Sequence, residues 1–277
     1  MIIDSHTHLL QESVRRKPDK TPNGELYMGN VFNKESVDLI RKAEYEQLIE
    51  TMNDVGVDKS IVMGFPWKSS KLCEENNDYV IDALNKYPNR LIGFAVVQPL
   101  DVDRAIFETK RCIDAGMIGV KLKPSWQGYS LSDSGKIDRF INYVRENGIP
   151  LFLHISQAYK EQNGDSVYDF FSFIRKHDLP LIIAAHLGGG SFIYNFLPEI
   201  KTLFSNILFD TSLPKTPEMV RLAVDSIGAR KIVFGSDFPF GDQENIIEKL
   251  KSLLKQDDFK LITGENAQRG ILDFKRG

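Results

Sequence analysis

Short apolar segments rich in β-branched residues recur along the chain, and longer segments with helical spacing of apolar positions lie between them. Such short runs are typical of buried parallel strands, and the longer segments are typical of the amphipathic helices that connect them. The predicted strands are Ile2–His6, Ser60–Gly64, Leu91–Val97, Ile118–Lys121, Pro150–His154, Leu181–His186, Ile207–Asp210 and Lys231–Gly235. The predicted helices are Ser36–Val55, Cys73–Tyr87, Val102–Ala115, Lys136–Asn147, Val167–His177, Ser191–Phe204, Pro217–Ile227 and Glu244–Leu254.

Eight strand–helix repeats in 277 residues predict a single-domain (β/α)₈ TIM barrel over residues 1–277. No glycine-rich dinucleotide fingerprint follows the first strand, which argues against an open Rossmann sheet. The segment from Leu9 to Asn33 breaks the repeat, because it is polar and contains two prolines and two glycines. A connection of this length in a compact domain is usually functional, so we expect it to form a lid or a wall of the site.

Composition and charge exclude several classes of protein. The net charge of −3 gives no electrostatic footprint for DNA or RNA. The N-terminus lacks the apolar core of a signal peptide, and no apolar stretch is long enough to cross a bilayer. Cys73 and Cys112 lie in predicted helices and are expected to be reduced thiols. We therefore expect a cytoplasmic protein that binds a small molecule, with a homodimer as one candidate assembly.

Four of the five histidines stand at the carboxyl ends of predicted strands: His6, His8, His154 and His186. In a barrel these ends form one rim, where active sites are found. His6 and His8 are two residues apart on a strand, so they share a face with Cα atoms roughly 6.6 Å apart and can bind one ion. The H-x-H pattern alone is a weak signal, because paired strand histidines also face solvent or form core hydrogen bonds.

Asp237 follows the eighth predicted strand. A single carboxylate in such a place is more often a helix N-cap than a ligand. Closure of the barrel would bring the eighth strand beside the first, however, and would place Asp237 next to His6 and His8. We therefore favour the ligand interpretation for Asp237.

Taken together, these motifs resemble the amidohydrolase superfamily. The segments that look like its amidohydrolase-related branch are Ile2-Ile3-Asp4-Ser5-His6-Thr7-His8, His186-Leu187-Gly188-Gly189-Gly190, Phe234-Gly235-Ser236-Asp237-Phe238-Pro239 and Gly264-Glu265-Asn266-Ala267. That branch includes aminocarboxymuconate-semialdehyde decarboxylase and relatives of 2-pyrone-4,6-dicarboxylate lactonase. The resemblance covers the chain from end to end, and the order and spacing of the motifs are more specific than any single motif.

The resemblance implies that His6, His8, His154 and Asp237 bind one divalent metal, with Zn²⁺ expected and Mn²⁺ as the alternative. It leaves His186 as an acid or base, and Asp237 as the group that transfers a proton. The function expected from it is hydrolysis of a small lactone or amide, carrying a carboxylate, by water that the metal activates. Non-oxidative decarboxylation of an unsaturated or aromatic acid on the same metal is the alternative.

Lys121 and Lys123 share one face of the fourth predicted strand, and three interpretations remain open. Both lysines could face the helices. Alternatively, Lys121 could be carboxylated and bridge two metals, in which case the resemblance implies that His154 and His186 bind the second ion. The third interpretation is that Lys123 binds a substrate carboxylate. Close relatives of this branch often have a histidine where Lys123 stands, so this departure puts substrate identity in doubt.

Weaker candidates surround these residues. The Arg15–Arg16 pair could reach an anionic substrate or simply be solvated, and Trp126 and Tyr129 could line the pocket or pack in the core. Asp210 is expected either to hydrogen-bond a group behind the metal ligands or to cap the next helix. Asp4 is expected to have a structural or supporting role one layer below His6.

The sequence favours two other functions less. A TatD-like deoxyribonuclease shares the fold and the H-x-H start, but it typically has Glu at the position of Lys121, and the negative net charge disfavours DNA. A barrel that binds a ligand without catalysis is disfavoured because the whole candidate ligand set is present, although a fold alone never implies a function.

Overall fold

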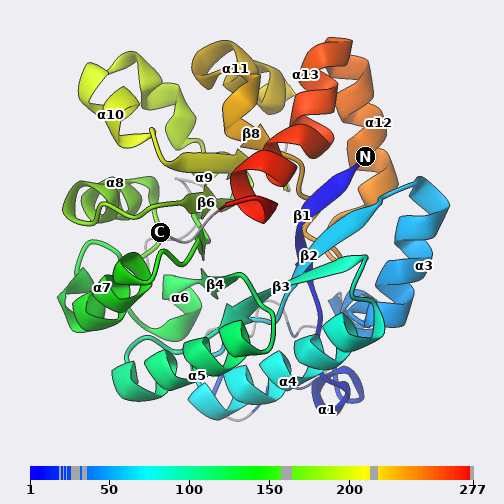
Figure 1. The fold of residues 1–277 in the computed structure, drawn as a ribbon, viewed down its shortest axis with the longest axis vertical. Helices are drawn as coiled ribbons and strands as arrows, with labels where there is room; N and C mark the ends of the chain where they lie inside the picture. The colour runs from blue at the N-terminus through cyan, green and yellow to red at the C-terminus, as the bar shows by residue number, and fades with distance from the viewer. Residues whose placement is uncertain are drawn as a thin grey trace.

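The structure is a computed structural model that describes residues 1–18, 20, 22, 24–25, 32, 36–156, 164–212 and 218–274. Within these residues eight parallel strands form one sheet in chain order, and helices surround it (Figure 1). The strands are β1 (Ile3–His8), β2 (Lys59–Met63), β3 (Leu91–Val96), β4 (Gly119–Leu122), β5 (Leu151–Leu153), β6 (Ile182–Ala184), β7 (Ile207–Asp210) and β8 (Ile232–Val233). The predicted (β/α)₈ TIM barrel is confirmed.

Helices follow the strands on the outside of the barrel. The principal ones are α3 (Tyr45–Val55), α4 (Ser70–Lys86), α5 (Val102–Asp114), α7 (Asp138–Glu146), α8 (Val167–Lys176), α11 (Glu218–Ile227) and α12 (Gln243–Leu253). Shorter helices are α1 (Glu12–Arg15), α2 (Val37–Lys42), α6 (Pro124–Gln127), α9 (Ala185–Gly188), α10 (Pro198–Leu203) and α13 (Gln256–Lys260). The 3₁₀ turns are η3 (Ser134–Ile137), η4 (Ser191–Phe196) and η5 (Ala229–Lys231), and the π-helical turns are η6 (Leu261–Glu265) and η7 (Gln268–Leu272).

The ring closes between the last strand and the first. Past β8 the backbone continues along β1, where the amide of Ser5 donates to the carbonyl of Phe234 (2.7 Å) and the amide of His8 donates to that of Phe238 (2.7 Å). The β1–β2 register shifts between Asp4 and Thr7. Irregularities of this kind re-aim side chains and are frequent beside active sites. Closure therefore brings Asp237 to the carboxyl end of β1, as the sequence predicts.

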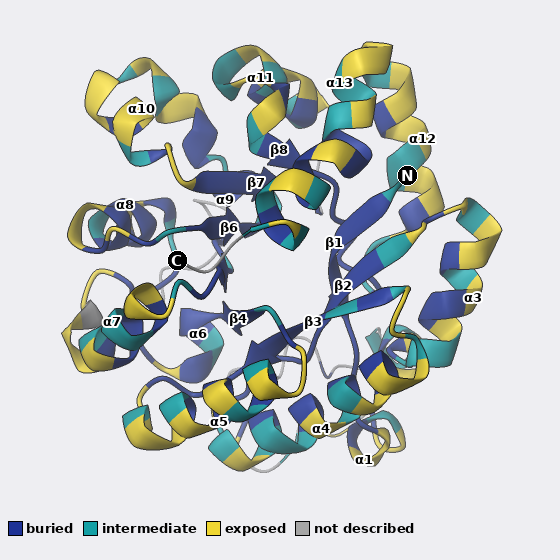
Figure 2. Ribbon diagram, in the orientation of Figure 1, coloured by how far each residue is buried: buried dark blue, intermediate teal, exposed yellow. Residues whose placement is uncertain are grey.

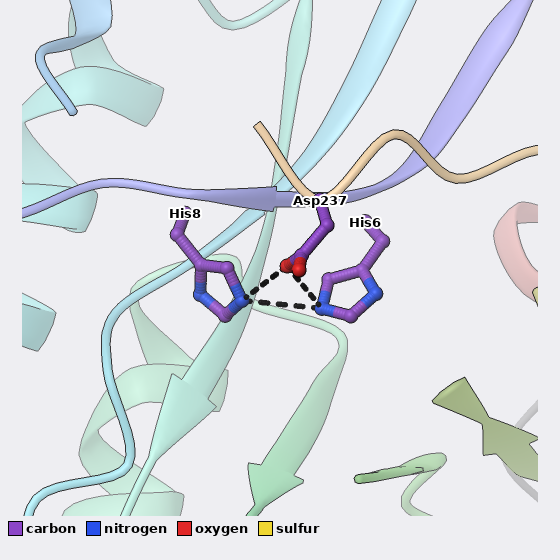
Figure 3. Close-up of side chains that lie close together, drawn as sticks. All are labelled: His6, His8 and Asp237. Carbon is purple, nitrogen blue, oxygen red and sulfur yellow. Dashed lines mark hydrogen bonds and ion pairs between the residues drawn. The ribbon is translucent and has the colours of Figure 1, made fainter. Parts of the chain in front are cut away.

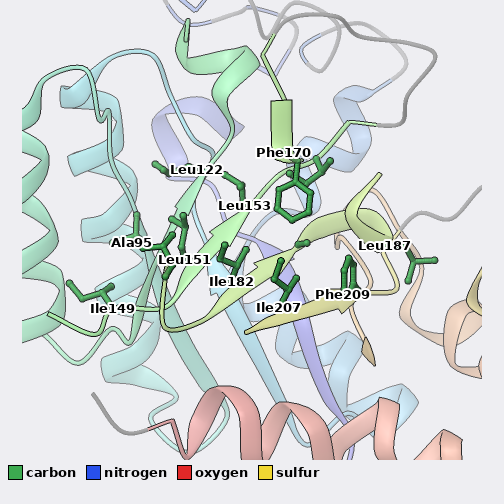
Figure 4. Close-up of a cluster of buried hydrophobic side chains, with 14 of the residues drawn as sticks. Ala95, Leu122, Ile149, Leu151, Leu153, Phe170, Ile182, Leu187, Ile207 and Phe209 are labelled. Carbon is green, nitrogen blue, oxygen red and sulfur yellow. The ribbon is translucent and has the colours of Figure 1, made fainter. Parts of the chain in front are cut away.

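The core has an outer and an inner part, which follow from the alternation of side chains along each strand. Leu151 and Leu153 of β5 point outward and pack with Phe170 of α8 and Phe209 of β7 (Figure 4). Phe152, between the two leucines, joins the inner cluster. Buried residues line the strands and the inner faces of the helices, whereas exposed residues lie on the outer helical faces (Figure 2).

The C-terminal turns close the amino end of the barrel. Ala267 and Ile271 pack against Ile3, which begins β1, and against Val233 of β8. Gly264 permits this approach, because a Cβ there would lie 2.1 Å from the carbonyl oxygen of Met1. The carboxyl end is thereby left as the open end of the barrel.

Two predicted helices are divided in the structure. The segment Ser36–Val55 forms α2 and α3, separated where the carbonyl of Ala43 accepts a hydrogen bond from the amide of Leu10 (2.8 Å). The segment Ser191–Phe204 forms η4 and α10, separated at Pro198, which begins α10. Much of the long connection Leu9–Asn33 and the start of the helix predicted at Pro217 lie outside the described residues.

Cys73 and Cys112 are buried and form no disulfide, as expected. Among the described residues, no helix combines the length and the apolar character that crossing a bilayer requires.

Candidate metal centre and pocket

The carboxyl ends of the strands bring most of the predicted site residues to one pocket of about 250 Å³. We call it the site pocket, and it is lined by His8, Phe65, Pro66, Lys121, Lys123, Trp126, His154, His186, Asp237 and Phe240. His6 does not line the pocket but is fully buried beside His8, with the two Nε2 atoms in contact. At 250 Å³ the pocket is smaller than the cavities that hold drug-sized ligands, so its dimensions suit a small molecule with one ring.

His6, His8 and Asp237 converge on one point (Figure 3). The two Nε2 atoms lie 3.1 Å apart, and Oδ1 of Asp237 lies 3.3 Å from Nε2 of His6 and 3.2 Å from Nε2 of His8. The far side of each ring fixes its tautomer. Nδ1 of His6 lies 2.9 Å from the Asp210 carboxylate, and Nδ1 of His8 lies 3.2 Å from the carbonyl of Gly64. Both partners are acceptors, so both Nδ1 atoms carry the proton and both Nε2 atoms present lone pairs.

Three lone pairs that face one another at this spacing repel unless a cation lies between them. A metal ion about 2.1 Å from its ligands holds neighbouring ligand atoms about 3.0 to 3.4 Å apart in octahedral or tetrahedral geometry. The observed separations of 3.1 to 3.3 Å agree with that spacing. His6, His8 and Asp237 therefore fit a divalent metal.

Asp210, at the end of β7, lies behind this cluster and is fully buried. Its Oδ2 accepts the hydrogen bond from His6, and its Oδ1 accepts from the backbone amides of His186 (2.9 Å) and Ser212 (2.9 Å) and from the Ser212 hydroxyl. Ser212 Oγ also lies 2.8 Å from Nδ1 of His186 and 3.1 Å from Nδ1 of His6. Gly235 makes room for this arrangement, because a Cβ there would lie 2.9 Å from Cβ of His6.

His154 lies across the pocket from the cluster and does not take part in it. Its Nδ1 is 3.1 Å from Nε2 of His186, and its Nε2 is 2.6 Å from Nζ of Lys123. Because Nδ1 of His186 faces the carbonyl of Ser212 at 3.2 Å, it carries a proton, and Nε2 of His186 accepts. A directed chain results, in which Lys123 donates to His154, His154 to His186, and His186 to Ser212.

His186 owes its position to a left-handed turn after β6. His186 and Leu187 have φ of 56° and 53°, and the three glycines that follow also have positive φ. Gly189 needs to be glycine for two reasons, its φ of +63° and a carbonyl of Ser156 that would lie 2.5 Å from a Cβ. The glycine run after His186 thus permits both the left-handed turn and the close approach of the backbone to Ser156.

Burial is the main electrostatic influence in the site. It lowers the pKa of His6, and it lowers the pKa of His186 to about 4, so both rings are neutral at pH 7. It also lowers the pKa of Lys121 to about 7. For Asp237, burial acts to raise the pKa, but the interactions with the neighbouring His6 and His8 rings outweigh it, so that its pKa lies well below the ordinary value.

Aromatic rings line the remaining walls of the pocket. Phe65 stacks on Phe240 with ring centroids 5.7 Å apart and meets Trp126 at 5.9 Å. The Lys123 ammonium lies over the Trp126 ring, 4.3 Å from its centroid. Lys121 is buried, with Nζ 4.3 Å from the Phe152 centroid and 3.4 Å from Nε2 of His6. Both lysines therefore point into the barrel, which excludes the interpretation that they face the helices.

Other predicted residues lie elsewhere. Arg15 pairs with Glu44 (3.0 Å) and donates to the hydroxyl of Tyr79 (3.2 Å), and neither Arg15 nor Tyr129 lines the site pocket. Arg16 forms an exposed ion pair with Glu12.

Asp4 has a structural position, as expected. It accepts hydrogen bonds from the amide of Ser236 (2.9 Å) and the side chain of Gln243 (2.6 Å), and burial raises its pKa to about 6. These bonds hold the turn that presents Asp237.

Sequence reasoning missed Ser212, Phe65 and Phe240. Phe65 and Ser212 lie two residues after the ends of β2 and β7, so their position relative to the strand ends is the signal that could have identified them, whereas Phe240 lies seven residues after β8. A serine after Asp210 looks like an ordinary turn residue, and the two phenylalanines look like core.

Comparison with solved structures finds the same fold in several enzymes. A 5-carboxyvanillate decarboxylase from Sphingomonas paucimobilis superposes with a TM-score of 0.80 at 14% identity, covering 100% of this chain and 99% of that one. A dihydroxybenzoic acid decarboxylase from Polaromonas sp. JS666, with bound manganese and the inhibitor 2-nitroresorcinol, gives 0.78 at 16% identity, with 97% and 96% covered. A putative amidohydrolase from Staphylococcus aureus gives 0.73 at 18% identity, with 98% and 99% covered.

At these identities the likeness shows a shared fold. No curated protein sequence matches the chain significantly. The model of the amidohydrolase family, however, matches residues 3–270, which is nearly the whole chain. Its span includes both the H-x-H motif of β1 and Asp237 after β8. The chain therefore belongs to the amidohydrolase family, as its motifs indicate.

Proposed function

We propose that the protein is a metal-dependent decarboxylase, which releases CO₂ from a small aromatic or otherwise unsaturated acid. The observation that carries this proposal is the make-up of the site pocket. The His6–His8–Asp237 cluster adjoins it, and two lysines point into it. The remaining lining residues are Phe65, Trp126, Phe240, Pro66, His154 and His186. The decarboxylases of similar fold, one of them with bound manganese, support the same reading. The decarboxylase alternative is thus preferred to the lactone or amide hydrolysis that the motifs first suggested.

We propose His6, His8 and Asp237 as ligands of a divalent ion, with Zn²⁺ and Mn²⁺ as the candidates. Such an ion would supply a Lewis acid that holds the reacting carboxylate. Three protein ligands leave coordination positions open, as in catalytic sites. Nε2 of His154 now accepts a hydrogen bond from Nζ of Lys123 at 2.6 Å. For His154 to act as a fourth ligand through this atom, the ion would have to displace the Lys123 ammonium.

The side chains of the pocket supply the rest of the chemistry. Lys123, together with Lys121 in its protonated form, attracts the anionic substrate, and the rings of Phe65, Trp126 and Phe240 give a planar substrate apolar walls to pack against. When the carbon–carboxylate bond breaks, its electron pair stays on the ring carbon, which must take up a proton while CO₂ leaves. Asp237 and His186 border the pocket and are the proposed groups for that proton transfer.

The decisive experiment measures product from two substrate panels. Purified enzyme with Mn²⁺ or Zn²⁺ is incubated with hydroxybenzoic and carboxybenzoic acids, and CO₂ release is followed in a coupled assay. In parallel, lactones and amides are tested by base consumption at constant pH. The Asp237→Asn variant serves as the control. CO₂ release that disappears in the variant supports the proposal, whereas base consumption without CO₂ release contradicts it.

Hydrolysis is a second candidate, favoured by a specific observation. Nδ1 of His154 and Nε2 of His186 face each other at 3.1 Å, a spacing that a second ion could span, and Lys121 lines the same pocket. In the binuclear version of the site, His154 and His186 would hold the second ion once the proton between them is displaced, and Lys121 would be carboxylated. Two equivalents of metal, together with a protein mass increased by one CO₂, would favour this candidate. One equivalent and an unmodified Lys121 would favour the decarboxylase.

A further inference from the structure

We infer that Asp210 is a positioning residue that sets the orientation of imidazoles on both sides of the pocket, namely His6 and His186. Its effect on metal binding rests on the proposed metal site, whereas its effect on the two rings does not. Neither the family match nor the similar structures assign a role to this residue.

The two oxygens of Asp210 serve opposite sides of the site. Oδ2 accepts only the His6 ring among the hydrogen bonds given by described residues, at 2.9 Å. Oδ1 accepts the backbone amide of His186 (2.9 Å), which belongs to the left-handed turn, and both the amide and the hydroxyl of Ser212. One fully buried carboxylate therefore connects β1 to the turn after β6.

The donors around Oδ1 explain why the residue must be a carboxylate. Two of them are backbone amides, which cannot reverse their direction, so an oxygen is required on that side. If Asn replaced Asp210, its oxygen would face these amides and its NH₂ group would face Nδ1 of His6. Two donors cannot share a hydrogen bond, so His6 would move its proton to Nε2. The lone pair that now faces His8 and Asp237 would be lost.

The same carboxylate is the accepting end of the directed chain across the pocket. Ser212 donates to Asp210 and receives from Nδ1 of His186, which leaves Nε2 of His186 to accept from His154. His154 in turn accepts from Lys123. A lysine ammonium can only donate and a carboxylate can only accept, so the direction of every bond between them is determined.

The test measures ring tautomers and metal affinity rather than turnover. Full-length protein with ¹⁵N-labelled histidine is examined by long-range ¹H–¹⁵N correlation, which distinguishes protonated from lone-pair ring nitrogens, before and after reconstitution with Zn²⁺. Wild-type protein should show a protonated Nδ1 on both His6 and His186. In Asp210→Asn, metal-free His6 should carry its proton on Nε2, and Zn²⁺ affinity should fall by about 10- to 100-fold.

Two further variants separate positioning from general damage. Ser212→Ala keeps the bond between Asp210 and His6, so it should retain the His6 tautomer and bind Zn²⁺ more tightly than Asp210→Asn does. Asp165→Asn alters another fully buried carboxylate, which binds the Ser125 hydroxyl (2.6 Å), and should change neither quantity.

The wild-type spectrum alone can overturn the inference, because a lone-pair Nδ1 on His6 or His186 contradicts it even if Asp210→Asn fails to fold. An Asp210→Asn protein with the wild-type tautomer and Zn²⁺ affinity also overturns it. Absence of CO₂ release by wild-type enzyme would instead count against the proposed function and leave the tautomer result standing.

Discussion

Nζ of Lys123 lies 2.6 Å from Nε2 of His154 and 4.3 Å from the centroid of the Trp126 ring. The cation is thus positioned from two sides at the wall of the pocket. A lysine held in this way can meet a carboxylate without first being ordered, which reduces the entropic cost of binding.

Replacing Lys123 should therefore weaken substrate binding. In Lys123→Gln we expect KM for an acidic substrate to rise by about 10- to 100-fold, since hydrogen bonds to charged groups contribute about 1.5–3 kcal/mol. Steady-state kinetics measure the effect, and Arg15→Gln is the matched control because Arg15 pairs with Glu44 away from the pocket. Equal effects of the two substitutions would show that general surface charge, and not Lys123, attracts the substrate.

Asp237→Asn should abolish turnover while leaving the barrel intact. The substitution removes a proposed metal ligand. Its effect on activity should exceed the roughly 10- to 100-fold losses that follow when a residue hydrogen-bonded to a metal ligand is replaced. Initial rates, metal content and circular dichroism check the three parts of this expectation. Normal activity in this variant would contradict the proposed metal-dependent mechanism.

Metal removal should lower thermal stability. A ligand that binds only the folded state at about 100 times its Kd stabilises it by about 2.7 kcal/mol. For a domain of this size that corresponds to a Tm about 5 to 10 °C higher. Calorimetry of chelator-treated protein, with and without added Mn²⁺ or Zn²⁺, measures the shift. The same titration of Asp237→Asn should give a much smaller change, and an equal shift in both proteins would place the ion elsewhere.

His177 should make the stability depend on pH. Its side chain is buried between Phe173 and Asp138, and burial lowers its pKa below the ordinary value of 6.5. The unfolded chain therefore binds a proton first as the pH falls. The contribution of His177 to the free energy of unfolding is therefore fully present above pH 6.5. It declines as the pH falls from 6.5 to the pKa of the folded state.

Denaturant midpoints at several pH values between 7.5 and 5 test this expectation. The His177→Gln protein should lose less stability over that interval than the wild type. Identical slopes for the two proteins would mean that His177 does not titrate differently in the folded and unfolded states.

The sequence predicts the fold well wherever the spacing of apolar residues follows the period of a strand or a helix. Apolar runs identified all eight strands, because parallel strands buried on both faces are nearly continuous in apolar residues. The same logic placed His6, His8, His154 and His186 at one rim. Pro198 marked a helix boundary that could have been read from the sequence, since proline favours the first turn of a helix.

What the sequence did not reveal depends on contacts between distant segments. The hydrogen bond from Leu10 to Ala43 divides a helix whose local pattern is continuous. Ser212 contacts two histidines only because β1, β6 and β7 end at the same level. The pairing of His154 with Lys123 depends on the register of β4 and β5, which periodicity does not specify.

The closure of the ring has a consequence for biosynthesis. β8 is only two residues long, and Asp237 follows its last residue by four positions, while its proposed co-ligands lie at the other end of the chain on β1. A growing polypeptide therefore cannot assemble the centre until Asp237 has left the ribosome. Metal binding would then join the first and last strands only in chains whose synthesis has passed Asp237.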